Sequence, residues 1–73
     1  MRFGVKIHFK DKSIQYLYKL TENAMYFNSR PIAIYPTEEA AIQAAKRVED
    51  LFSEVVEHAE VLFIDSEQTT HAS

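Results

Sequence analysis

The sequence predicts an α+β domain in which a small antiparallel sheet of three to four strands packs on one long amphipathic helix. Apolar and polar residues alternate near the amino terminus, which is typical of a half-buried strand. In the second half of the chain, apolar residues recur every three or four positions, which is typical of a helix. A chain of 73 residues has room for one core. We therefore expect residues 1–65 to form a single domain and residues 66–73 to be a flexible tail.

The first two predicted strands form a hairpin. The inward side chains of the first are Phe3, Val5, Ile7 and Phe9. Gly4 falls on its polar face, where a missing side chain usually marks a bulge or a close approach by another backbone. Turn-forming residues follow at 11–13. By the same alternation, the inward side chains of the second strand are Ile14, Tyr16, Tyr18 and Leu20, and Leu17 points outward.

A broken edge strand, a helix and a last strand complete the predicted order. Pro31 cannot donate a ladder hydrogen bond and interrupts the strand-like residues 25–35. Thr37 is the predicted N-cap of a helix over residues 38–58. The final strand is expected at residues 60–65, and its continuous apolar run 61–64 predicts a covered, central position in the sheet.

Charge is distributed unevenly along the chain. Residues 1–30 hold six basic and two acidic side chains, whereas residues 31–73 hold two basic and nine acidic ones. Four acids in the second half of the predicted helix, where the macrodipole disfavours them, suggest a partner-binding face. These residues are Glu49, Asp50, Glu54 and Glu57. We therefore expect a non-enzymatic protein-binding module whose acidic helix face docks on a basic surface of its partner. Such a module would be an accessory or inhibitor protein of the phage or mobile-element type, for example an anti-defence protein or a nucleic-acid mimic.

The basic outer face of the predicted sheet supports a nucleic-acid-associated module as an alternative. Its residues are Arg2, Lys6, His8, Lys10 and Lys19. Aromatic side chains that alternate inward weigh against this alternative, because binding through a sheet usually exposes aromatics for base stacking. Leu17 and Tyr26 are candidate apolar anchors on the surface. A small core and a broken edge strand also make a homodimer plausible.

No motif predicts catalysis, a metal site or a cofactor. The chain has no cysteine and a single glycine, so zinc-finger, redox and phosphate-loop motifs are absent. The spacing of His8, His58 and His71 matches no metal-ligand motif. An enzymatic role would require a pocket between subunits lined by His8 or by tyrosines, and remains a third alternative. Without a signal peptide or a long apolar run, a cytoplasmic protein with no membrane partner is expected.

Overall fold

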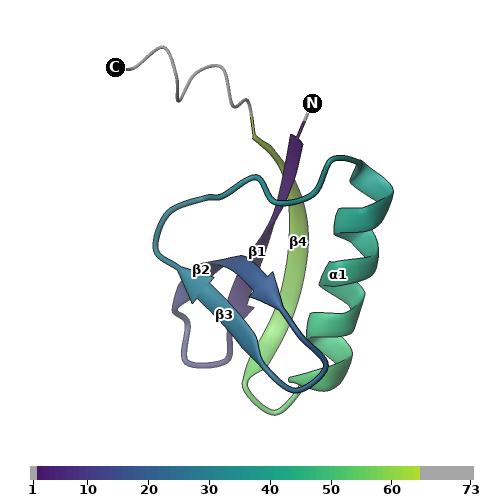
Figure 1. The fold of residues 1–73 in the computed structure, drawn as a ribbon. Coiled ribbons are helices and arrows are strands. Elements are labelled where there is room, and N and C mark those ends of the chain that lie inside the picture. The colour runs from purple at the N-terminus through teal and green to yellow at the C-terminus, as the bar shows by residue number, and fades with distance from the viewer. Residues whose placement is uncertain (1, 65–73) are drawn as a thin grey trace.

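A computed structural model describes residues 2–64, which form a four-stranded antiparallel sheet and one helix (Figure 1). The elements in chain order are β1 (Arg2–Phe9), β2 (Ile14–Leu20), β3 (Met25–Asn28), α1 (Glu38–Leu51) and β4 (Val56–Ile64). The strands lie in the order β3-β2-β1-β4. This confirms the predicted α+β class and element order, although the 14-residue helix is not long. The tail predicted for residues 66–73 lies outside the described residues.

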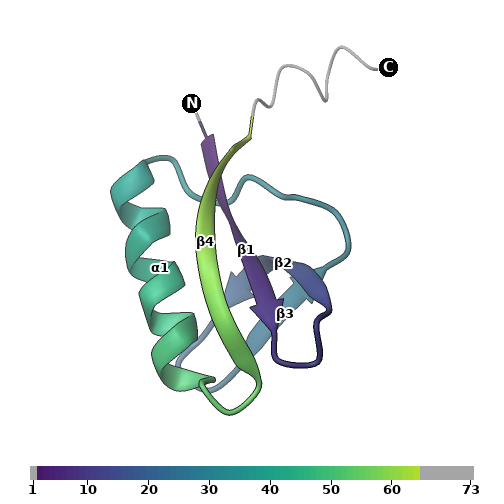
Figure 2. The same cartoon turned by 180° about the vertical axis from the view of Figure 1, so that it is seen from behind.

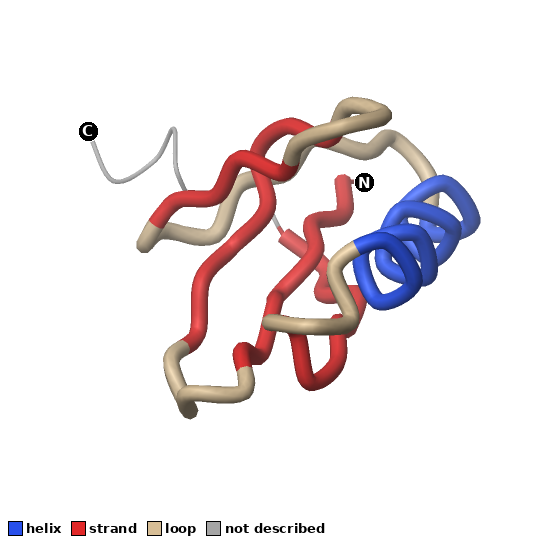
Figure 3. Tube along the Cα trace, turned by 90° about the horizontal axis from the view of Figure 1, so that it is seen from below, coloured by secondary structure: helices blue, strands red, loops and turns tan. Residues whose placement is uncertain are grey.

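The helix packs on one face of the sheet, called here the inner face (Figure 3). The buried core consists of Val5, Ile7, Leu17, Ala41, Ala44, Ala45, Val48 and Val56. Phe3 and Phe9 pack against this core, as the alternation in β1 predicts. The three alanines of α1 have little volume, so the helix approaches the sheet closely.

Thr37 caps the amino terminus of α1 as predicted, because its hydroxyl accepts a hydrogen bond from Ala40 N at 3.2 Å. The predicted carboxyl end at residue 58 is wrong. The helix ends at Leu51, and the N–H of Phe52 donates the final helical bond to the carbonyl of Val48. The apolar residues beyond this point supply a turn and the start of β4 instead.

β2 presents different side chains to the core than the alternation predicted. Leu17 is completely buried, whereas Tyr18 is 45% exposed and Ile14 is 42% exposed. Tyr16 pairs with Lys6 across the ladder and so shares its outer face. A β-bulge between Leu17 and Lys19 places the next inward residue at Leu20. The prediction of Leu17 as a surface anchor is therefore wrong.

β4 is an edge strand rather than the predicted central one, and it begins at Val56 rather than residue 60 (Figures 1 and 2). The apolar residues at the end of β4 are therefore not explained by a central position in the sheet, but by a segment that covers them. Gly4 lies on the outer face opposite Leu62, and a Cβ on it would come within 2.5 Å of the Ile32 carbonyl oxygen and 2.7 Å of Ile64 Cδ1. The chain at Ile32 thus covers this end of the outer face. The close backbone approach predicted at Gly4 is confirmed.

The third strand is broken and lies at an edge, as predicted. β3 ends at Asn28, and Tyr35 then pairs with Phe3 through an isolated antiparallel bridge. Backbone bonds from Phe3 N to Tyr35 O and from Ile34 N to Phe3 O attach this returning segment to β1. Among residues 2–64, no helix is long and apolar enough to cross a membrane.

Candidate functional site

Three tyrosines and several basic side chains gather on the outer face of the sheet, the face opposite α1. We call this surface the tyrosine platform. Its members, assigned from strand register and exposure, are Lys6, His8, Tyr16, Tyr18, Lys19 and Tyr26. The sequence had predicted inward positions for Tyr16 and Tyr18, but Tyr16 pairs with the outward Lys6 and the buried residue between them is Leu17, so the alternation was assigned to the wrong face of β2. The predicted exposure of Tyr26 is confirmed at 43%.

The bulge arranges the most exposed part of the platform. Tyr18 is the extra residue at the register shift, and the next residue, Lys19, pairs with Tyr26 in β3. The rings of Tyr18 and Tyr26 are 6.1 Å apart between centroids and tilted by 49°. Lys19 Nζ lies 5.5 Å from the centroid of Tyr26, within the range of a cation–π contact. Two aromatic surfaces and an ammonium group are thereby held together at one edge of the sheet.

The other basic residues predicted for this face are dispersed. Arg2 is exposed at the start of β1, whereas Lys10 follows β1 and borders a groove on the inner side of the sheet. Lys6 lies 3.9 Å from the carboxylate of Glu60, which is half exposed. The positive charge of the platform is thus that of Lys6 and Lys19.

Two histidines and a carboxylate meet where β1 pairs with β4. His8 lies directly across the ladder from His58, and their rings stack with centroids 4.1 Å apart and an interplanar angle of 15°. His8 Nε2 is 2.8 Å from Glu60 Oε1. This hydrogen bond lowers the pKa of the Glu60 carboxyl, and the nearby charges of His8, Lys6 and His58 act in the same direction. The sequence had placed His58 near a helix end, 50 residues from His8, and so did not predict the cluster.

The four acids predicted to form one helix face lie in three different elements. Glu49 and Asp50 are in α1, Glu54 is in the turn that follows, and Glu57 is in β4. Glu49 already has a structural partner, because its carboxylate accepts a hydrogen bond from the Ala59 N–H at 2.7 Å. Glu57 lies 4.0 Å from Lys12.

A groove opens on the inner face beyond the carboxyl end of α1. Its volume is about 460 Å³, and its apolar walls are Phe9, Met25, Phe27 and Val55, with Lys10, Asp11 and Glu54 at the rim. Phe27 is 44% exposed and Val55 is 51% exposed. Phe9 and Phe27 make an edge-to-face contact with centroids 5.2 Å apart. We call this feature the apolar groove.

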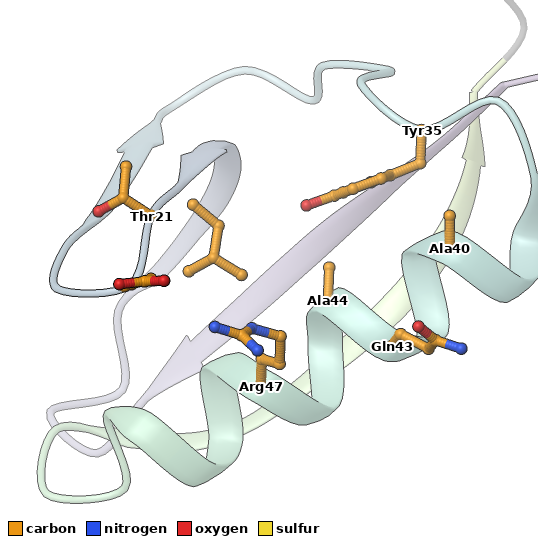
Figure 4. A pocket seen from close by; sticks show the side chains of 8 residues that line it. Thr21, Tyr35, Ala40, Gln43, Ala44 and Arg47 are labelled. Carbon is orange, nitrogen blue, oxygen red and sulfur yellow. The ribbon is translucent and has the colours of Figure 1, made fainter.

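A second groove, of about 420 Å³, separates α1 from the β2–β3 turn (Figure 4). Tyr35 and Arg47 extend into it, and Thr21, Ala44 and Gln43 also line it. Burial raises the pKa of the Tyr35 hydroxyl, so this group remains protonated at neutral pH. The groove brings together hydrogen-bonding and charged groups, with Glu22 also in its lining.

Comparison with known proteins finds no matching family model, no similar curated protein and no similar solved structure.

Proposed function

We propose that this domain binds single-stranded nucleic acid on the tyrosine platform. The observation that carries the proposal is the exposure of Tyr18 and Tyr26 on the outer face beside Lys19. Single strands are bound by aromatic side chains that stack with bases and by basic side chains that follow the phosphates. The sequence argued against nucleic-acid binding because the aromatic side chains were predicted to point inward, but these two tyrosines are exposed on the outer face.

The charge around the platform also suits a polyanion. Lys6 and Lys19 carry the positive charge of this part of the face, Lys6 Nζ lies 3.9 Å from the Glu60 carboxylate, and Glu57 lies 4.0 Å from Lys12. The acids of α1 and of the turn after it lie away from the platform, so the net charge of −3 does not describe this surface. Local potential rather than net charge determines where phosphates collect.

The test is fluorescence anisotropy with a labelled oligothymidine at low salt. Replacing an aromatic ring that stacks with a base costs about 1–3 kcal/mol, which corresponds to a loss of roughly five- to 150-fold in affinity. Tyr18→Ala is expected to show such a loss, whereas Tyr18→Phe keeps the ring and most of the affinity. Lys19→Ala should weaken binding and make it less dependent on salt.

Lys46→Ala is the matched control for Lys19→Ala, because Lys46 is exposed on α1. If Lys46→Ala weakened binding as much as Lys19→Ala does, only the overall charge of the domain would matter. Absence of saturable binding at low salt, or unchanged binding by Tyr18→Ala, would refute the proposal.

The apolar groove favours a second candidate function, protein binding. Exposed Phe27 and Val55 provide apolar contact area, and the acidic Glu54 also lines the groove. Two more of the four predicted acids, Asp50 and Glu57, lie close to Glu54 in the sequence. Such a surface suits a basic segment with apolar anchors, in agreement with the basic partner expected from the sequence.

NMR titration with a synthetic basic amphipathic peptide tests this second function. Amide shifts are expected at Phe27 and Val55, and Phe27→Asp should abolish them. Glu54→Gln should weaken binding, whereas Glu38→Gln, at the exposed opposite end of α1, serves as the control. Shifts confined to the tyrosine platform, or none, would refute binding in the groove.

A further inference from the structure

The cluster of His8, His58 and Glu60 has the composition of a transition-metal site. Imidazole nitrogens and carboxylate oxygens are the donors that Zn²⁺ and its neighbours Co²⁺ and Ni²⁺ accept in proteins. The candidate ligand atoms of these three residues all lie within 4.8 Å of one another. Around a four-coordinate ion with bonds of about 2.0–2.2 Å, ligand atoms are separated by roughly 3.3 Å. Only small side-chain movements separate the two arrangements.

The sheet fixes the backbone of this cluster. His8 and His58 face each other in the β1–β4 ladder, and Glu60 follows His58 on the same face, opposite Lys6. Directly paired residues have Cβ atoms about 4.5–5.5 Å apart. The ladder changes register immediately after the histidine pair, where Phe9 pairs with Val56 and leaves Glu57 as the extra residue. Bulges of this kind redirect neighbouring side chains and often occur next to functional sites.

The side chains must rearrange modestly to enclose an ion. Parallel stacked imidazoles direct their nitrogen lone pairs side by side, so each ring has to rotate about its Cβ–Cγ bond for the lone pairs to converge. This torsion has a broad energy profile, and the half-exposed carboxylate of Glu60 is also free to move. His8 Nε2 and Glu60 Oε1 already lie 2.8 Å apart, so two of the three candidate ligands start side by side.

We infer that His8, His58 and Glu60 form a binding site for a zinc-class divalent ion, with at least one coordination position open to solvent. This inference does not depend on the proposed binding of nucleic acid. One neighbouring group opposes the ion. Lys6 Nζ lies 3.9 Å from Glu60 Oε1 and repels a cation there, so the site has a modest affinity that removal of this charge would raise.

The experiment uses the full chain after treatment with a chelator, titrated with Zn²⁺ by calorimetry and with Co²⁺ by visible absorption. A stoichiometry of one ion per chain is expected, with the absorption bands of Co²⁺ bound to nitrogen and oxygen ligands. His8→Ala and His58→Ala should each weaken binding by about tenfold or more, since each removes one of three ligands. Lys6→Ala should strengthen binding severalfold.

His71→Ala is the control, because it removes the one other histidine of the chain. Unchanged affinity in this variant supports the site, whereas loss of binding in it would overturn the inference. Equal binding by wild type and His58→Ala, weaker binding by Lys6→Ala, or no saturable binding would also overturn it. Paramagnetic broadening of wild-type amide signals by Co²⁺ tests the location without a substitution. Broadening centred on residues 8, 58 and 60 supports the site, and broadening elsewhere contradicts it.

Discussion

Substitution of Gly4 by alanine tests how closely the returning segment packs on the outer face of the sheet. The new Cβ would be 2.5 Å from the Ile32 carbonyl oxygen and 2.7 Å from Ile64 Cδ1. Real Cβ atoms do not approach other heavy atoms so closely, so the backbone at Ile32 or the end of β4 must move. The backbone oxygen is the harder of the two to displace, because bonds between Phe3 and residues 34–35 fix the same segment to β1.

Two opposing contributions determine the magnitude of the effect. Overpacking costs typically about 1–3 kcal/mol. Replacing a strand glycine by alanine otherwise gains about 0.5–1 kcal/mol, because the unfolded chain loses freedom. Because the new Cβ would meet a backbone oxygen as well as Ile64, the cost lies in the upper part of its range, and we expect Gly4→Ala to destabilise the domain by about 1–2 kcal/mol. At about 4–8 °C per kcal/mol in a domain of this size, the thermal midpoint should fall by roughly 4–16 °C.

Urea unfolding and a thermal melt measure the effect, and a double-mutant cycle identifies its cause. Ile64→Val removes the Cδ1 atom that the new Cβ would contact. The cost of Gly4→Ala should therefore be smaller in the Ile64→Val background than in the wild type, although the contact with Ile32 remains. A Gly4→Ala variant as stable as the wild type would refute the reasoning.

Three further predictions concern other local features. Thr37→Ala removes the N-cap acceptor of α1 and should lower the free energy of unfolding by about 1 kcal/mol in urea titrations; Thr37→Ser should recover most of it, and equal losses would contradict the capping role. Glu49→Gln should accelerate hydrogen exchange at the Ala59 amide, which Asp50→Asn should leave unchanged, because Glu49 alone accepts that bond at the free edge of β4. Hydrogen bonds from the Ser13 side chain and backbone lower the pKa of Asp11, so Ser13→Ala should raise that pKa in an NMR titration. Because the folded-state pKa of Asp11 is depressed, this interaction stabilises the fold at pH values above the ordinary carboxyl pKa of 3.8, and the stabilisation is lost as the pH falls through the folded-state pKa. An unchanged Asp11 pKa in Ser13→Ala would refute the assignment.

The sequence predicted those features of the fold that depend on local patterns. Alternation placed Val5 and Ile7 in the core, Thr37 has the chemistry of an N-cap, and Pro31 indicated a broken third strand. Spacing of three and four residues identified the buried alanines of α1. The position of each strand in the sheet depends on pairing between distant segments, which no local pattern determines. β4 was consequently misplaced at the centre of the sheet.

The error at the end of α1 arose from accepting apolar spacing over electrostatics. Leu51, Phe52 and Val55 continue the helical period, but Asp50 and Glu54 would be like charges one turn apart near the negative end of the dipole. We interpreted this violation as a sign of a binding face. Ending the helix at Leu51 removes the Asp50–Glu54 pair from one helix face, although Glu49 and Asp50 remain in the last turn of α1.

Most of the candidate site depends on two register shifts that the sequence does not reveal. The bulge at Tyr18 inserts one residue between the inward Leu17 and Leu20, so Lys19 faces outward together with Tyr18. In the β1–β4 ladder, His8 pairs with His58, and the register shifts immediately after this pair. Each bulge adjoins one of the two proposed sites, the tyrosine platform or the histidine–glutamate cluster, and His8 belongs to both. A bound divalent ion would add positive charge to the platform, so the two proposals, although tested independently, predict that zinc strengthens rather than weakens the binding of a single strand.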